Sequence, residues 1–378
     1  MISKRIENLK PSGIREFFEL VLETKGVISL GVGEPDFDTP WNVREKGIWS
    51  LEEGLTSYTS NKGLLQLRKQ ISLYLKHRYG VYYDPQDEIL ITVGVSEGLD
   101  LCIRALVDGG DRVIVCSPYY VAYPAIVKIQ GGEVLYLHLK KEEDFKINIG
   151  ELKKMLKYRP KAIILNYPAN PTGVSYTRKE LYQIWKALKD TDCLVISDEI
   201  YSELSYDFCH TCFSSFKGAK SKTLLLGGFS KNYCMTGFRI GFVCGSSSLI
   251  SALTKIHQYT ILCAPTVSQF SALEALKIPL KEMEAIRREY ARRREFIIKE
   301  LKTLGWDVVY PQGAFYCFAD IKRDGFKFAK DLLFKKKVAL VPGEAFGEEF
   351  TSYVRITYAQ NLSLLKEAVE RIREFVNQ

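Results

Sequence analysis

The sequence has few of the residues that usually bind metals, and its cysteines follow no regular spacing. It holds four histidines and nine cysteines in 378 residues. An odd number of scattered thiols, several inside apolar runs, fits reduced cysteines better than a disulfide framework. Cys209 and Cys212 have the spacing of a metal or redox motif, but neither a second pair nor a histidine cluster accompanies them. We therefore expect no metal site.

Long apolar runs are also missing. The longest are the length of a strand and fall well short of the roughly 20 residues that span a bilayer. The first residues lack the apolar core and cleavage site of a signal peptide. These features predict a cytoplasmic protein that has no membrane partner.

The net charge of +8 raises the possibility of nucleic-acid binding, above all at the basic run 287–296. On a helix, however, Glu284 and Arg288 lie four residues apart, and Glu289 and Glu295 interrupt the positive charge. This pattern is typical of a solvated helix face, so we expect no nucleic-acid partner. The excess charge favours small anionic substrates instead.

The middle of the chain alternates short β-branched runs with amphipathic segments. Buried runs separated by helices indicate a mostly parallel sheet covered on both faces. The predicted class is α/β, with a seven-stranded sheet flanked by helices. The seven predicted strands are 88–93, 112–117, 133–139, 161–167, 193–199, 222–229 and 239–245.

The C-terminal part has a different pattern, and the length allows two domains. A long charged helix over 280–303 precedes short strands and a closing helix at 361–376. We predict a large domain over 45–280. A smaller α+β domain is predicted to combine 281–378 with the N-terminal segment 1–44.

Polar residues stand where several predicted strands end, which is where parallel sheets bind ligands. Gly94 allows a tight turn after the first strand, and Ser96 is the expected N-cap of the next helix, whose amides suit a phosphate. Asn170 precedes Pro171 in a stiff loop, which makes this bond a candidate cis peptide. A turn that simply needs Asn and Pro explains the loop equally well.

Two further strand ends carry ionisable groups. Asp198 ends an apolar strand, where a carboxylate is costly unless it meets a cation such as a protonated ring nitrogen. The stretch 227–242 adds the Lys231 amine, the Ser230 hydroxyl and Arg239. An amine, an acid for a ring nitrogen and several phosphate donors are what pyridoxal 5′-phosphate requires. Burial and nearby cations would leave the amine free to attack a carbonyl.

Seven ordered motifs between residues 27 and 359 carry a family resemblance: "VISLGVGEPDFDTP", "TSYTSNKGLLQLRKQI", "NPTG", "SDEIYSEL", "FSKNYCMTGFRIGF", "GAFY" and "VPGEAFG…YVRITYA". The sequence resembles the class I/II aminotransferases, which are pyridoxal-phosphate enzymes of fold type I. It is most similar to the branch that contains prokaryotic aspartate and aromatic aminotransferases. The resemblance implies that the large domain binds the cofactor.

The resemblance also implies the contacts of the cofactor ring. Lys231 forms the Schiff base, and Asp198 pairs with the pyridinium nitrogen. Asn170 and Tyr201 hydrogen-bond the phenolate oxygen, and Tyr120 stacks on the ring. Lys231, Asp198 and Tyr201 are the implied catalytic residues.

The implied phosphate site consists of Arg239 and the backbone amides near Val95 and Ser96. Some relatives place a phosphate-binding serine three residues before the lysine, where this chain has Gly228. Ser230 is the hydroxyl that could serve instead.

Other matches concern the substrate and the neighbouring subunit. Tyr58 matches a tyrosine that reaches the phosphate of the neighbouring subunit, which implies a homodimer with shared active sites. Arg355 matches the arginine that holds the substrate α-carboxylate by two parallel bonds, a geometry that lysine cannot offer. The backbone of Gly33, together with Tyr120 and Asn170, completes the implied substrate site.

The resemblance predicts transfer of an amino group from an acidic or aromatic L-amino acid to a 2-oxo acid, with 2-oxoglutarate expected. Arg104 and Arg15 could each bind a distal carboxylate, although solvent-exposed arginines are the more common explanation. A β-eliminating C–S lyase on the same fold is the alternative function, because both reactions begin with the same steps.

Overall fold

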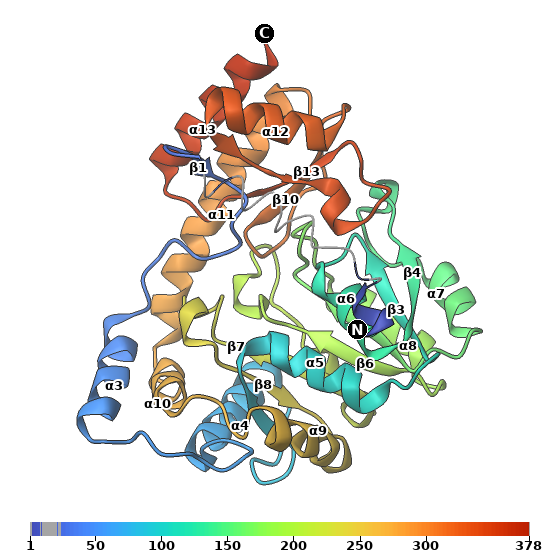
Figure 1. Cartoon of the computed structure of the whole chain (residues 1–378), viewed down its shortest axis with the longest axis vertical. Helices are drawn as coiled ribbons and strands as arrows, with labels where there is room; N and C mark the ends of the chain where they lie inside the picture. The colour runs from blue at the N-terminus through green and yellow to red at the C-terminus, as the bar shows by residue number, and fades with distance from the viewer. Residues whose placement is uncertain (1, 8, 10–20, 22–23, 378) are drawn as a thin grey trace.

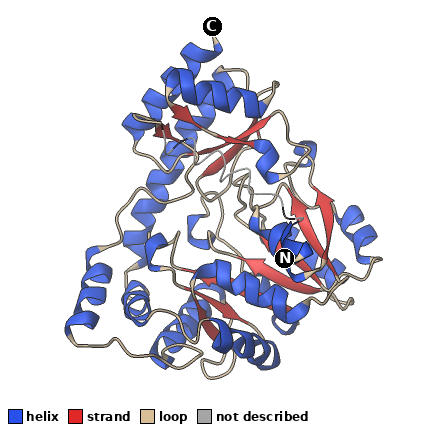
Figure 2. Ribbon diagram, in the orientation of Figure 1, coloured by secondary structure: helices blue, strands red, loops and turns tan. Residues whose placement is uncertain are grey.

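The computed structural model describes residues 2–7, 9, 21 and 24–377 (Figure 1). Arg15 lies outside the described residues. The described chain contains a large sheet with helices on both of its faces and a smaller sheet near the C-terminus (Figure 2). The predicted α/β class is confirmed.

The large sheet has seven strands in the order β2-β8-β7-β6-β5-β3-β4. β8 runs antiparallel to both of its neighbours, and the other pairs are parallel. The strands are β2 (Ile89–Thr92), β3 (Arg112–Ser117), β4 (Glu133–His138), β5 (Ala162–Asn166), β6 (Leu194–Asp198), β7 (Thr223–Gly228) and β8 (Gly241–Cys244). Each of the seven predicted strands is present, so the mostly parallel seven-stranded sheet is confirmed.

Side chains from successive residues of each strand enter opposite cores, because a strand has a period of two. In β5, Ile164 packs in the core on one face and Ile163 in the core on the other. The first face is covered by α5 (Gly94–Leu106), α6 (Ala122–Gln130) and α9 (Ser247–Thr260). The second is covered by α7 (Ile149–Leu156), α8 (Arg178–Leu188), α3 (Trp41–Glu52), α4 (Leu65–Tyr79) and α10 (Thr266–Ala275). Burial on both faces explains why the strands are continuous apolar runs.

A single long helix, α11 (Leu280–Thr303), runs from the large sheet to the small one (Figure 1). The small sheet is antiparallel in the order β12-β13-β10-β9. Its strands are β9 (Asp307–Val308), β10 (Tyr316–Asp320), β12 (Val341–Pro342) and β13 (Tyr353–Thr357), accompanied by α12 (Gly325–Lys336) and α13 (Leu362–Val376). The boundaries predicted at 44/45 and 280/281 stay predictions.

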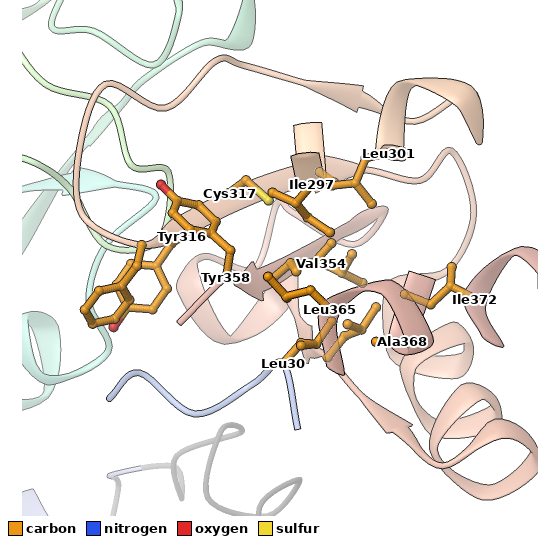
Figure 3. Packing of buried hydrophobic residues seen from close by; sticks show 14 of the residues in the cluster. Leu30, Ile297, Leu301, Tyr316, Cys317, Val354, Tyr358, Leu365, Ala368 and Ile372 are labelled. Carbon is orange, nitrogen blue, oxygen red and sulfur yellow. The ribbon is translucent and has the colours of Figure 1, made fainter. Parts of the chain in front are cut away.

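The N-terminal segment is joined to this C-terminal part by a parallel pair of strands, β1 (Ile28–Ser29) and β11 (Val338–Ala339). Leu30 follows β1 and is fully buried. Figure 3 shows it beside Leu365 and Val354, in the core that α11 and α13 also enter. Apolar burial therefore fixes the start of the chain against its end.

The basic run on α11 is largely neutralised by ion pairs. Arg288 lies 2.9 Å from Glu284, and Arg293 lies 2.7 Å from Asp36.

Every helix in the described part of the chain is too short or too polar to span a bilayer. Within the same residues, no group of three or more His, Cys, Asp or Glu could hold a metal ion.

Candidate active site

A cavity of about 730 Å³ lies where β5, β6 and β7 end and α5 begins. It brings together residues that are far apart in the sequence. All the predicted site residues except Tyr58 line it: Gly33, Val95, Ser96, Tyr120, Asn170, Asp198, Tyr201, Ser230, Lys231, Arg239 and Arg355. The side chain of Tyr58 is exposed instead, with a relative exposure of 81%.

Asp198, the last residue of β6, presents a buried carboxylate to this cavity. Its Oδ2 accepts a hydrogen bond from the Tyr123 hydroxyl at 2.7 Å, and its Oδ1 accepts one from the Ile200 amide at 3.2 Å. Burial nevertheless raises the pKa of Asp198 to about 6. The two hydrogen bonds thus do not compensate for the hydration that the carboxylate loses on burial. A cation in the cavity would stabilise its charged form.

Lys231 lies in the loop after β7, and its Nζ donates to the Gly33 carbonyl at 2.5 Å. Burial lowers the pKa of Lys231 to about 8. Nearby Arg355 and Arg239 lower it further, while Glu34 opposes them. At mildly alkaline pH much of this amine is neutral, as a nucleophile or a general base requires.

Arg239 lies against the start of α5. The backbone of Gly94 has φ +70°, and a Cβ there would come within 2.7 Å of the Arg239 guanidinium. Only glycine therefore allows both the turn and the close approach of the arginine. A guanidinium beside the free amides of a helix N-terminus forms a cradle for an anion.

The predicted N-cap at Ser96 is wrong. α5 begins at Gly94, so Ser96 lies in its first turn, and no side chain caps the helix at Val93. The turn at Gly94 starts the helix early, and the Glu97 carboxylate accepts from the Val93 amide at 2.5 Å. Ser96 still lines the cavity.

Arg355, in the middle of β13, is buried between the rings of Tyr316 and Phe346, at 4.6 and 4.9 Å from its guanidinium carbon. Its Nη1 donates to Asn170 Oδ1 at 2.9 Å, and its Nη2 donates to the Gly31 carbonyl at 2.6 Å. Its Nε has no partner among the described residues. Because a guanidinium carries five N–H groups, donors remain for a carboxylate in the cavity.

Asn170 connects this arginine to the strand that carries Asp198. Its peptide bond to Pro171 is cis, as predicted. Its backbone N–H donates to Asn166 Oδ1 at 2.9 Å. The side-chain Nδ2 of Asn166 in turn donates to the backbone carbonyl of Asp198 at 3.0 Å. Since Arg355 occupies Oδ1 of Asn170, the Nδ2 group is the part that can donate to a ligand.

Gly228, where some relatives have a serine, packs closely against two neighbouring side chains. A Cβ on Gly228 would come within 2.9 Å of Ile200 and 3.0 Å of Val95, so a serine there would require these side chains to shift. Ser230 is buried and lines the cavity.

Comparisons with known proteins identify the family of this chain. The family model described as "Aminotransferase class I and II" matches residues 25–372. The chain belongs to the class I and II aminotransferases. The YugH protein of Bacillus subtilis strain 168 is 44% identical over 380 residues, which is 100% of this chain and 98% of that protein.

Two further matches to this aminotransferase carry different substrate names. An aspartate aminotransferase of Pyrococcus abyssi is 38% identical over 383 residues, covering 100% of this chain and 98% of that protein. The crystal structure of the aromatic aminotransferase from Pyrococcus horikoshii OT3 has a TM-score of 0.91 at 38% identity, covering 96% of this chain and 98% of the other. Members of the family depend on pyridoxal phosphate.

The cavity of this aminotransferase is also lined by residues to which the sequence analysis gave no role, among them Glu34, Tyr123, Asn166 and Tyr316. Tyr123 and Tyr316 belong to the stretches "SPYYVAYP" and "GAFY", so the sequence shows that tyrosines stand there. Their hydrogen-bond partners, Asp198 and Tyr201, lie far away in the sequence, so these contacts could not be predicted.

Arg104 does not reach the cavity. It is exposed on α5 and lies 3.4 Å from Asp100. It is also about 12 Å further along the helix than Ser96, at 1.5 Å per residue. The prediction that Arg104 binds the distal carboxylate of an acidic substrate is therefore wrong within one chain.

The raised pKa of Asp198 predicts a pH-dependent gain in stability for the cofactor-free Asp198→Asn variant. The folded pKa of about 6 exceeds the ordinary 3.8, so ionisation costs up to about 3 kcal/mol of folding free energy above pH 6. We expect urea unfolding to show this gain at pH 8 and about half of it at pH 5. The exposed Asp190→Asn variant is the control, and a less stable Asp198→Asn protein at pH 8 would contradict the prediction.

The lowered pKa of Lys231 predicts how fast the cofactor-free protein takes up pyridoxal phosphate. Only the neutral amine attacks an aldehyde, so the rate should rise with pH and level off above about 8. Stopped-flow absorbance between pH 6 and pH 10 measures this profile. A midpoint near the ordinary 10.5 would show that burial does not control the amine.

Proposed function

We propose that this aminotransferase moves the amino group of an acidic or aromatic L-amino acid to 2-oxoglutarate, with Lys231 as the Schiff-base residue. One observation carries the proposal: Lys231, Asp198, Arg239 and Arg355 line a single cavity. These four charged groups correspond to the aldehyde, the ring nitrogen and the phosphate of pyridoxal phosphate and to the carboxylate of an amino acid.

The residues present fit the cofactor. Among the described residues no cation pairs with the Asp198 carboxylate, whose pKa is raised by burial, and a protonated ring nitrogen would supply one. Arg239 and the start of α5 offer a cradle for the phosphate, with Ser230 nearby in the cavity wall. Asn170 Nδ2 and the Tyr201 hydroxyl are donors suited to the phenolate oxygen.

The substrate carboxylate would bind to Arg355. Asn170 and the Gly31 carbonyl fix two of its N–H groups, so the remaining donors are already oriented before the substrate arrives. Little side-chain entropy is lost on binding, which favours affinity. The backbone of Gly33, which also lines the cavity, is the second proposed contact of the substrate carboxylate.

Pyridoxal phosphate, when bound, supplies an aldehyde for the substrate amine and a ring that withdraws electrons from the α-carbon. The proposed role of Lys231 Nζ is to take the proton from that carbon as a base and then to release it, as an acid, to the carbon that carried the aldehyde. Asp198 holds a proton on the ring nitrogen, and Arg355 keeps the α-carbon within reach of Lys231.

Tyr58 supports a homodimer as the proposed functional unit. The segment that carries it is hydrogen-bonded to the start of α10, where the Thr266 hydroxyl donates to the Ser57 carbonyl at 2.8 Å. Tyr58 and Tyr259 are 81% and 86% exposed. The family resemblance places this tyrosine at the phosphate of a second chain, and its exposure leaves the side chain free to make that contact.

Within the described residues, Lys231, Arg239 and Arg355 are the cations that line the cavity, and each has a proposed role already. An acidic donor would thus need a further cation from the partner chain or from outside the described residues. Aromatic donors would need none. Both classes stay in the proposal.

The donor profile of the purified enzyme, with 2-oxoglutarate as acceptor and glutamate as the readout, tests the proposed function. We expect glutamate from aspartate or from phenylalanine and tyrosine. The Lys231→Ala variant should lose both this activity and the visible absorbance of the cofactor. Pyruvate and ammonia from a β-substituted amino acid, without glutamate, would support the C–S lyase instead.

Replacing Arg355 with lysine tests its proposed role in binding the substrate carboxylate. We expect Arg355→Lys to raise the KM for every amino donor about tenfold or more, because a lysine cannot make two parallel bonds. Arg104→Ala is the control and should leave the ratio of acidic to aromatic activity unchanged. Steady-state kinetics with both donor classes measures the two variants, and an unchanged KM in Arg355→Lys would contradict the assignment.

A further inference from the structure

We propose that Tyr316 is a positioning residue that orients the Tyr201 hydroxyl towards the cofactor. The proposal rests on the proposed function, because it concerns the same site. Tyr316 begins β10 in the small sheet, whereas Tyr201 follows β6 in the large one. The contact between them therefore joins the two parts of the molecule directly at the cavity.

The two side chains meet through their hydroxyl groups. The Tyr201 and Tyr316 oxygens lie 2.9 Å apart, and the rings cross at 84° with centroids 5.8 Å apart. Both residues line the cavity, and Tyr316 is only 1% exposed. Figure 3 shows Tyr316 at the edge of the core that it shares with Tyr358.

The direction of this hydrogen bond follows from the number of protons. A phenol carries one hydrogen. If Tyr201 donates its hydrogen to the cofactor, its oxygen must accept the one from Tyr316. A hydroxyl that accepts a hydrogen bond becomes a better donor, because hydrogen bonds in series polarise one another. Burial raises the pKa of Tyr201 and of Tyr316, so both hydrogens are present at neutral pH.

Tyr316 is itself held firmly. The Arg355 guanidinium lies 4.6 Å from its ring centre, an arrangement that attracts a cation to the ring. On another side, a methyl group on Gly33 would overlap the Tyr316 hydroxyl. With these neighbours the hydroxyl is confined to the place where it meets Tyr201.

The ring and the hydroxyl of Tyr316 can be tested separately. Tyr316→Phe keeps the ring against Arg355 and removes only the hydroxyl. Tyr316→Leu removes both. We expect Tyr316→Phe to leave the KM for amino donors nearly unchanged and to lower kcat several-fold, whereas Tyr316→Leu should also raise KM.

The decisive readout is the pH midpoint at which the bound cofactor changes its absorbance, measured without substrate. A hydrogen bond donated to the phenolate oxygen withdraws electron density, so the adjacent nitrogen of Lys231 holds its proton less tightly and the midpoint falls. Loss of the donor should raise the midpoint. We expect Tyr201→Phe to give a large upward shift and Tyr316→Phe a smaller one.

A double-variant cycle shows whether Tyr316 acts through Tyr201. In the Tyr201→Phe background, adding Tyr316→Phe should cause no further shift, because the bond is already lost. Tyr358→Phe is the matched control. This buried tyrosine belongs to the same core, and its hydroxyl donates to the Ala314 carbonyl at 3.3 Å, so its loss should leave the midpoint unchanged.

Gly33→Ala provides a second route if Tyr316→Phe folds poorly. Its methyl group should displace the Tyr316 hydroxyl and raise the midpoint. In a Tyr316→Phe background the nearest remaining ring atom is 3.2 Å away, so the same change should have a smaller effect.

Two outcomes would overturn the inference. Equal midpoints in the wild type and Tyr316→Phe, with Tyr201→Phe shifted, would reject it and leave the proposed function intact. Additive shifts in the double variant would show that Tyr316 acts independently of Tyr201. A wild-type protein without any cofactor absorbance would instead reject the proposed function itself.

Discussion

The guanidinium of Arg355 is the point on which the site depends. It is buried, and it bonds the Gly31 carbonyl and Asn170 Oδ1, which belong to the N-terminal segment and to the loop after β5. A buried cation is stable only when its hydrogen bonds are satisfied. Burial therefore forces three distant segments to meet at one place, and that place is the edge of the sheet where Asp198 and Lys231 also lie.

The free protein bears an electrostatic cost at this edge. Burial moves the pKa of Asp198 up and that of Lys231 down, so each group is driven towards its neutral form. Such groups do not help the fold, and they are best explained by what they bind. The surrounding sheet has apolar cores on both of its faces, whose burial opposes this cost.

The sequence was sufficient to predict the large sheet, because each strand is a buried apolar run bounded by turns. Most of the cavity could be predicted too, since the carboxyl ends of parallel strands meet and Asp198, Asn170 and Lys231 follow them. Ser96 was misplaced because a glycine turn started the helix early. Tyr123 and Tyr316 had no predicted role, since their hydrogen bonds join segments that only the folded chain brings together. Likewise, without the register of α5 the sequence could not predict that Arg104 lies on the exposed face of this helix.

The contact between Gly31 and Arg355 also has a consequence for folding during synthesis. The Gly31 carbonyl and the Arg355 guanidinium are 324 residues apart in the chain, so closing this contact requires nearly the complete polypeptide. On the ribosome, the large sheet has all its strands long before Arg355 is made. A nascent chain can thus bury most of its core and still lack the carboxylate-binding half of its site. A chain that ends before Arg355 would also lack most of β13, so β10 would lose its neighbouring strand and part of the C-terminal core would be exposed.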